Sequence, residues 1–295
     1  MRPLRVVFHS DDAGATASIT ERILHAWQSG WLDSFSIITN GDACALISQT
    51  LRAEPLRPVR LAVHLNLSEG PPASPVADVS MLVNRAGILR HTFVSLWMLW
   101  LKSPVARRQE LVRQIDTEWR AQVQRAKEIC APRVLDAVDS HNHVHMLPFL
   151  FPIALKIGAE AQINEIRVSR EPLFLSDRLA DTLRRQFIPN IVKHSLLRYL
   201  SSKADRLRAR TPLASAGALI GVFYTGMMSE AAATAGIRAA QRSGQDAEVV
   251  FHIGRASSSE AARWSHLPGV VRFFLSQRRD DEFAALRKLR EAPAR

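Results

Sequence analysis

The chain has 295 residues, of which 47% are hydrophobic and 23% are charged, and its formal net charge is +11 at pH 7. This is an ordinary composition for a soluble protein, and the length is enough for one large α/β domain or two small ones. The two cysteines, Cys44 and Cys130, lie far apart and form no CxxC pair, which excludes a disulfide framework and a cysteine zinc site. We expect both to be reduced, buried thiols.

Short apolar runs recur along the chain and predict seven strands, at residues 4–10, 34–40, 59–67, 133–141, 163–169, 218–224 and 247–253. Helices fit between them, most clearly at residues 15–30, 105–130 and 281–292. The first apolar run is too short for a secretory signal and ends in acids, so we expect a cytoplasmic protein. Strands that alternate with helices favour an α/β fold, a single domain over residues 1–295 that forms an irregular, TIM-barrel-like (β/α) barrel.

Six of these strands end in side chains that could bind a metal or move a proton. In chain order they are Asp11 and Asp12, Asn40, His64 and Asn66, Asp139 and His141, Arg167, and His252. The carboxyl ends of parallel strands meet at one face of such a fold, and functional sites are built there. We therefore expect these residues to form one site.

Residues 91–102 (HTFVSLWMLWLK) form an apolar segment rich in tryptophan. This pattern is typical of a buried or lid helix, and also of an interfacial helix at a lipid headgroup boundary. No stretch of the chain reaches the ~18 apolar residues of a membrane span. A peripheral contact with the inner face of a membrane stays open, as does a homodimer.

Residues 170–210 hold ten basic and four acidic residues and, extended to about residue 215, resemble a basic insertion. Such a segment could face an anionic membrane, a phosphorylated substrate or nucleic acid, or be a solvated basic surface. It lacks the interleaved aromatic residues of a nucleic-acid stacking platform, so we expect no nucleic-acid partner.

The run DSHNHVHML places Asp139, His141, His143 and His145 at every second residue. In a strand these side chains would share one face, but residues two apart are separated by roughly 6.5 Å, so they cannot all bind one ion. If the strand ends near His141, one histidine reaches a metal, and the others contact the substrate or anchor the loop.

The paired acids of SDDAG complement this run. One of two adjacent carboxylates can hold a cation while its neighbour takes a proton from water bound to that cation. An aspartate with two histidines suits zinc, manganese, cobalt, nickel or iron, and tolerates magnesium if waters complete the coordination. These pieces together favour a metallohydrolase.

Three motifs, HSDDAG, VHLNLSEG followed by PP, and DSHNHVHMLP, resemble those of the YdjC-like carbohydrate deacetylase family. The resemblance runs nearly end to end, with shorter matches at EWRAQ, IRVSREP, YTGMMS and AEVVFHIG, and it is closest to the HpnK-like branch associated with hopanoid biosynthesis. It implies an irregular barrel-like fold and the removal of N-acetyl groups from amino sugars. It also implies one divalent metal ion, with magnesium or zinc ahead of manganese, cobalt or nickel.

The resemblance implies that Asp12, His64 and His141 ligate the metal. It makes Asp11 the general base for the metal-bound water and points to His252 as the general acid to the departing amine. Five further side chains are candidates for contacts with the substrate or with the catalytic groups: His143, His145, Arg167, Asn66 and Glu118.

Two positions depart from the family pattern. Ala13 stands where the family motif ADDFG has a bulky residue, and Ile253 replaces the proline of a His-Pro-Gly sequence. Replacement of that proline could shift the loop that carries His252. Substrate choice would lie in the basic segment, which is hard to align.

Three functions stay open. The first is an N-deacetylase acting on an N-acetylated sugar or glycolipid. The second is a metal-dependent phosphoesterase on the same scaffold, with phosphate bound by the basic segment. The third is a non-catalytic, basic membrane-binding protein, against which the intact set of Asp11, Asp12, His64 and His141 argues.

Overall fold

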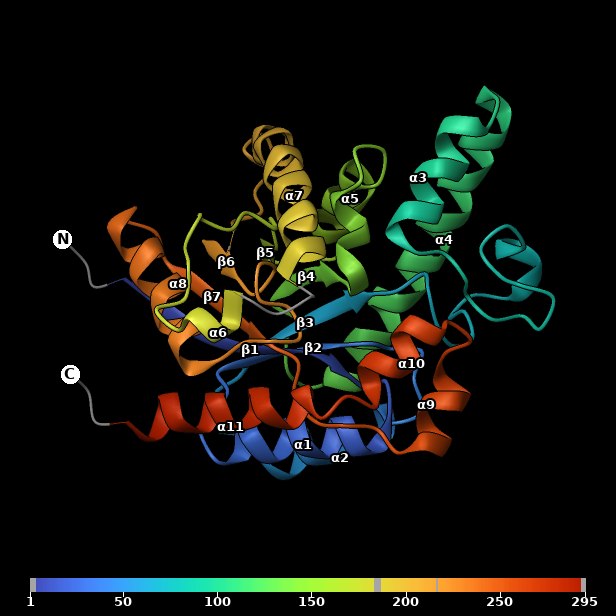
Figure 1. Ribbon diagram of the computed structural model, residues 1–295. Coiled ribbons are helices and arrows are strands. Elements are labelled where there is room, and N and C mark those ends of the chain that lie inside the picture. The colour runs from blue at the N-terminus through green and yellow to red at the C-terminus, as the bar shows by residue number, and fades with distance from the viewer. Residues whose placement is uncertain (1–3, 183–186, 216, 293–295) are drawn as a thin grey trace.

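A computed structural model describes residues 4–182, 187–215 and 217–292 of the chain (Figure 1). At its centre lies a parallel sheet of seven strands in the order β5-β4-β3-β2-β1-β7-β6. In chain order the strands are β1 (Val6–Ala13), β2 (Ser34–Ile37), β3 (Arg60–Leu65), β4 (Ala137–Ser140), β5 (Glu165–Ile166), β6 (Ala218–Ile220) and β7 (Ala247–Phe251).

Helices connect the strands and pack on the sheet. The α-helices are α1 (Ala17–Gln28), α2 (Cys44–Ala53), α3 (Phe93–Lys102), α4 (Val105–Cys130), α5 (Phe151–Glu160), α6 (Leu179–Thr182), α7 (Phe187–Arg208), α8 (Glu230–Arg242), α9 (Ser258–Trp264), α10 (Pro268–Phe274) and α11 (Arg278–Glu291). Two 3₁₀ turns are η1 (Val76–Val79) and η2 (His141–Met146). The ends of α1 follow from its sequence, because the Thr16 hydroxyl accepts from the Ile19 amide and Gly30 leaves the helix at a φ of 76°.

One face of the sheet is apolar and lies beneath the helices. Successive strand residues point to opposite faces, and Phe35, Ile37 and Val63 are fully buried on this one. Trp27 of α1 packs edge to face on Phe35, with ring centroids 6.2 Å apart. Each side chain of this size stabilises the fold by about 1.5–3 kcal/mol through burial, so this layer fixes the sheet against its helices.

The opposite face of the sheet is polar and still buried. Alternate positions of five strands place these side chains there: His9, Asp11, Ser34, Ser36, Arg60, His64, Asp139 and Glu248. Buried polar groups need partners, and here they find them in one another through ion pairs and hydrogen bonds. The interior of the sheet is therefore a charged network, and the site is built on it.

The predicted α/β fold with an irregular barrel is confirmed, since each predicted strand overlaps an observed one. Several strands are shorter than predicted, above all β5 and β6, because the residues that follow them leave the ladder to form loops. The sheet curls without closing fully. The Leu219 amide of one edge strand, β6, donates at 2.9 Å to the carbonyl of Arg170, in the segment that follows the other edge strand, β5.

The apolar and basic segments are helical. The segment at 91–102 forms α3, of whose ten residues one, Leu96, is fully buried. The basic segment contains α6 and α7, and its being an insertion stays a prediction. Across the described residues, no helix combines the length and the apolar character needed to cross a bilayer. Cys44 and Cys130 are buried free thiols that form no disulfide, as predicted.

Candidate metal centre

Two adjacent aspartates at the end of β1 both face the polar interior. Neighbouring residues of a regular strand point to opposite faces, so this placement needs a break in the strand. The pairing of β1 with β2 shifts between Ser10 and Ala13, and Asp12 has a φ of 75°, in the left-handed region. The irregularity turns Asp12 toward the interior that Asp11 already faces. Strained residues of this kind concentrate at functional sites.

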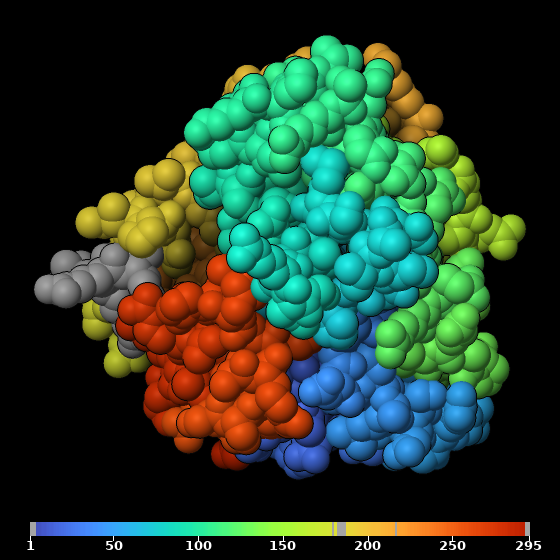
Figure 2. All heavy atoms as spheres, turned by 90° about the vertical axis from the view of Figure 1, so that its right-hand side faces the viewer, coloured from blue at the N-terminus to red at the C-terminus, as the bar shows by residue number. Residues whose placement is uncertain are grey.

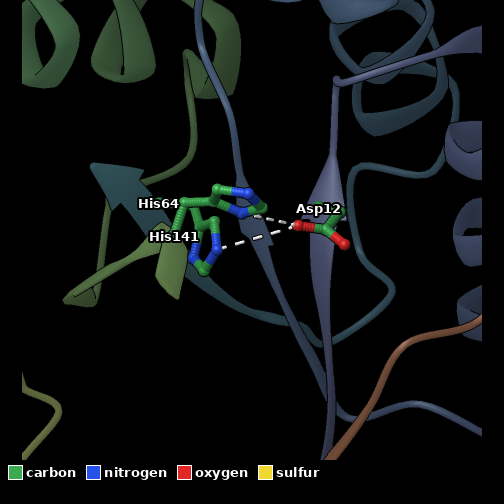
Figure 3. Close-up of side chains that lie close together, drawn as sticks. All are labelled: Asp12, His64 and His141. Carbon is green, nitrogen blue, oxygen red and sulfur yellow. Dashed lines mark hydrogen bonds and ion pairs between the residues drawn. The ribbon is translucent and has the colours of Figure 1, made fainter. Parts of the chain in front are cut away.

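Asp12 lies against two histidines from neighbouring strands, and both rings point toward its carboxylate (Figure 3). His64 belongs to β3 and His141 follows β4, and their ring centroids are 5.5 Å apart. Oδ1 of Asp12 is 3.1 Å from Nδ1 of His141 and 3.8 Å from Nε2 of His64. One donor atom from each residue lies within 4.8 Å of the others. The structure thus brings together the three residues that the sequence predicts as metal ligands.

Each imidazole of this cluster has a carboxylate on its far nitrogen. Nδ1 of His64 is 2.7 Å from Oδ1 of Asp139, its partner in the β3–β4 register. Nε2 of His141 is 3.2 Å from Oε2 of Glu69. A carboxylate in this place fixes the tautomer of a ligating histidine and leaves the other ring nitrogen free to bind a cation.

The donor set fits a divalent cation. One carboxylate oxygen and two imidazole nitrogens suit zinc and the related transition metals, and tolerate magnesium. Burial opposes the charged form of His141, yet Glu69 and Asp12 outweigh it and raise the pKa of His141 to about 10. Arg279 holds the second oxygen of Asp12 at 3.1 Å. Two carboxylates that converge on one imidazole favour a positive charge at this point, which a bound cation would supply.

Asp11 lies beside the cluster in a network of ion pairs. Nη1 of Arg167 donates to both oxygens of Asp11, at 3.0 and 3.1 Å, and Nη2 lies 2.8 Å from Oδ2 of Asp139. Nε2 of His9 is 3.0 Å from Oδ1 of Asp11. Burial raises the pKa of Asp11, but Arg167 and the neighbouring histidines outweigh it, so this pKa lies well below its usual range. Asp11 is therefore an anion at neutral pH.

His252 approaches Asp11 from the end of β7. Its Nε2 is 4.0 Å from Oδ2 of Asp11, and its amide donates to Oε2 of Glu282 at 2.6 Å. Burial lowers the pKa of His252 to about 4, although Asp12 and Asp11 oppose the shift, so the ring is neutral at neutral pH. With Ile253 in place of the family proline, the loop still holds His252 next to Asp11.

The other two histidines of the run leave the cluster. β4 ends one residue before His141, and the chain then turns with a φ of 56° at Asn142 and 55° at His143. His145 is buried under this turn, where its Nε2 lies 2.8 Å from the carbonyl of Arg167. His143 is partly exposed, with its Nδ1 2.9 Å from a serine hydroxyl. One histidine of the run reaches the cluster, as predicted for a strand that ends near His141.

Asn66 and Glu118 are buried and hold a loop beside the site. The side-chain amide of Asn66 donates to the carbonyl of Glu69 at 2.8 Å. Glu118 accepts from the amides of Ala73 and Ser74 at 2.8 and 2.9 Å. These bonds fix the loop that carries Glu69 and do not place either side chain in the cluster. The predicted contact of both with the substrate stays untested, and their geometry favours a role in holding the loop.

Four residues of the site were not among the residues predicted for it: His9, Glu69, Glu248 and Arg279. His9 and Glu248 could have been identified from the sequence, because an ionisable residue inside an apolar strand indicates a polar interior or a functional site. Glu69 lies within a motif that carries the family resemblance, but nothing in its spacing marks it as a partner of a histidine. Arg279 lies in a strongly charged helix start, and folding alone brings it to Asp12.

An apolar pocket of about 580 Å³ opens beside the turn that carries the run of histidines. Its walls come from the starts of α3 and α10 and from α7, which surround a hollow in Figure 2. Asn142 lies on its wall, and Lys193 of α7 adds a positive charge. The pocket reaches Asn142, the residue after His141, and its described lining includes no residue of the cluster itself.

A protein family described as YdjC-like protein matches residues 5–290, so the chain belongs to the YdjC-like family. The family predicted from the motifs is confirmed, and the HpnK-like branch stays a prediction. A solved protein of Enterococcus faecalis V583, named as a cellobiose-phosphate cleavage protein, has a TM-score of 0.65 and 17% identity. The superposition covers 97% of this chain and 95% of that one, which shows a shared fold.

Relatives with named activities align over part of their length. A carbohydrate deacetylase of Oceanobacillus iheyensis is 28% identical over 160 residues, which are 54% of this chain and 63% of that protein. A chitooligosaccharide deacetylase of Escherichia fergusonii is 28% identical over 61% of this chain and 65% of its own length. That of Citrobacter koseri is 27% identical over 68% and 76%. The chain thus spans less than two thirds of the first two relatives.

Proposed function

We propose that the chain is a hydrolase that removes the N-acetyl group from an N-acetylated amino sugar with the help of a divalent metal ion. The observation that carries this proposal is the convergence of Asp12, His64 and His141 beside Asp11. The deacetylases among the relatives support the choice of reaction and of substrate class. Amide hydrolysis needs a polarised carbonyl, a water that loses a proton and a nitrogen that gains one.

Asp12, His64 and His141 would hold the ion. When bound, the ion would act as a Lewis acid that polarises the amide carbonyl and eases the loss of a proton from water. Asp139 and Glu69 orient the two imidazoles from behind, so the donor atoms already face one another before any ion arrives.

Asp11 and His252 would transfer a proton from the attacking water to the departing nitrogen. Asp11, an anion, accepts the proton that the attacking water loses as the new C–O bond forms. Because its pKa is low, Asp11 holds this proton weakly, and Nε2 of His252 lies 4.0 Å away as the next acceptor. His252 then donates the proton to the departing nitrogen as the C–N bond breaks. This sequence keeps the predicted roles, with Asp11 as general base and His252 as general acid.

The apolar pocket favours an amino sugar that carries an apolar group, such as the lipid part of a glycolipid. Phe93, Val192 and Leu196 are among the residues of its wall, and few hydrogen-bonding side chains join them. A further sugar unit would need hydrogen-bond partners for its hydroxyl groups, which this wall does not offer in number. The wall therefore supports an apolar substituent at the end of the site away from the cluster.

The test is acetate release from N-acetylamino sugars, oligosaccharides and alkyl glycosides of N-acetylglucosamine. The protein is stripped of metal and reloaded in turn with zinc, magnesium, manganese, cobalt or nickel. We expect metal-dependent acetate release that disappears in Asp12→Ala and His141→Ala, with both variants checked for folding by circular dichroism. Release of phosphate from phosphoesters, with no acetate from any amide, would instead establish the phosphoesterase alternative.

A further inference from the structure

We propose that α3 and α7 present a docking surface for a lipid bilayer that contains anionic lipid. The surface, named here the α3–α7 face, is defined by apolar side chains that stand in solvent. They are Val94, Met98, Leu101, Val105, Ile188, Ile191 and Val192, with exposed fractions between 39% and 70%. This inference concerns where the protein binds and does not depend on the reaction proposed above.

The core accounts for only part of the apolar character of α3. Leu96 is fully buried, and Phe93, Trp97, Leu99 and Trp100 pack against the core while partly buried. Val94, Met98 and Leu101 recur at helical spacing on its solvent side, with exposed fractions of 68%, 43% and 57%. Apolar residues along the solvent side of a helix indicate a surface that binds another molecule, because large exposed apolar patches mark interaction sites.

The start of α7 carries a second stripe of the same kind. Ile188, Ile191 and Val192 lie three and four residues apart, and their exposed fractions are 70%, 39% and 65%. Val94 and Val192 line one pocket, so the two stripes approach each other at its mouth. Both helices project above the sheet (Figure 1) and are separated by the hollow of Figure 2. Val94 and Val192 thus connect one end of each stripe to the pocket.

The charged residues within the two helical stretches are all basic, and the first acids that follow these stretches are Glu110 and Asp205. Residues 91–109 contain Lys102, Arg107 and Arg108 and no acid, and residues 187–204 contain three basic residues and no acid. Apolar side chains that enter the headgroup region, flanked by basic side chains, are the features of interfacial helices on anionic lipid. Trp97 and Trp100 of α3 are half-buried aromatic residues of the type enriched at membrane interfaces.

The same charges argue against the other partners that an apolar face can have. A symmetric dimer through the α3–α7 face would bring its basic residues against their own copies, which is unfavourable. An anionic bilayer complements the charge and needs no specific shape. Its surface would also lie next to the pocket that opens beside the cluster.

The test is co-flotation of the full chain with vesicles of phosphatidylcholine, alone or mixed with phosphatidylglycerol, without any substrate. We expect binding to the mixed vesicles that weakens as salt is raised. The double variant Met98→Glu with Leu101→Glu should lower the partition coefficient about tenfold or more, because two apolar side chains leave the interface. The matched control is Leu56→Glu, 94% exposed in the loop before β3 at the other end of the sheet, and it should bind like the parent.

Three outcomes would overturn the proposal. The first is no flotation with either vesicle, and the second is flotation that the double variant does not change. The third is a dimer, seen by light scattering, that Met98→Glu dissociates, since it would assign the face to a second copy of the chain. The parent and each variant are compared by thermal melting, so loss of fold is recognised separately. Because no substrate is present, failure here leaves the proposed deacetylation untouched.

Discussion

Glu69 places its Oε2 3.2 Å from Nε2 of His141 while it is fully buried, and within the described residues no well-aligned hydrogen bond satisfies either of its oxygens. A buried carboxylate without such bonds is costly, so its charge must be balanced nearby. His141 is the group that balances it, and the same contact directs Nδ1 of His141 toward Asp12. Glu69 is thus a positioning residue for one half of the cluster, as Asp139 is for the other.

Glu69→Ala should lower the affinity of the protein for zinc by about 10- to 100-fold, the range seen when partners of ligating histidines are removed. Glu69→Gln should lose less, because its amide oxygen can still accept from Nε2 of His141. Competition with a chromogenic chelator measures both affinities. Glu171→Ala is the matched control, since Glu171 is equally buried and bonds to the amides of Gly221 and Phe223 instead. Equal zinc affinity in all the variants would show that Glu69 does not position His141.

Arg167 connects three buried carboxylates, those of Asp11, Asp139 and Glu248. Removing the cation of a buried ion pair leaves uncompensated charge, so Arg167→Met should lower the free energy of unfolding by about 3–5 kcal/mol. Urea denaturation followed by circular dichroism measures the change. Arg120→Met, which breaks surface pairs with Asp116 and Glu160, should cost about 1 kcal/mol or less. A small loss in Arg167→Met would mean that the three carboxylates find other partners.

The buried carboxyl group of Glu171 should make the free energy of unfolding depend on pH. Burial raises its pKa from 4.5 to about 7, against the opposing effect of the amides that it accepts from. Between these two values the folded state keeps a proton on Glu171 that the unfolded state has lost, so the contribution of Glu171 to stability falls as pH rises from about 4.5 to 7 and then levels off. The share of Glu171 is at most about 3 kcal/mol.

Urea midpoints at a series of pH values between 5 and 8 test this expectation. Glu171→Gln cannot titrate, so the free energy of unfolding of the variant minus that of the parent should rise as pH rises toward 7, whatever the absolute stability of the variant. Glu282, whose pKa burial also raises to about 7, contributes with the same sign and remains in the variant. The exposed residue Glu230 provides the control variant Glu230→Gln, which should keep the full slope. Parallel curves for Glu171→Gln and the parent would contradict the expectation.

The fold could be read from the sequence because strands and helices alternate with different apolar periods. The long helix over 105–130 is found at the same residues, since its amphipathic pattern is uninterrupted. Strand ends were harder to predict, because a residue such as Ile166 ends its ladder where a loop begins, and local pattern does not mark that point.

The grouping of Asp12, His64 and His141 could be predicted because each of them follows or ends a strand, and parallel strands converge, whereas their assignment as metal ligands came from the family resemblance. Glu69 and Arg279 could not, because the position of Glu69 depends on the conformation of the loop after β3, and Arg279 lies at the start of α11, far from the cluster in sequence. The direction of Asp12 depends on a local irregularity of β1, which the pair of acids in the sequence does not reveal. Contacts that depend on loop conformation are therefore the part that required the structure.

The apolar pocket predicts that the chain prefers amino sugars with a longer apolar substituent. For alkyl glycosides of N-acetylglucosamine, KM should fall as the alkyl chain lengthens, because each buried methylene contributes up to about 0.8 kcal/mol. The rate constant kcat should change little, since the reacting amide lies at the other end of the site and the added contact is equal in the ground and transition states. Val192→Asp, at the pocket wall, should flatten the dependence of KM on chain length, while Val134→Asp, in the loop before β4, should not. A KM that is independent of chain length in the parent would remove the apolar substituent from the proposed substrate and leave the deacetylation itself standing.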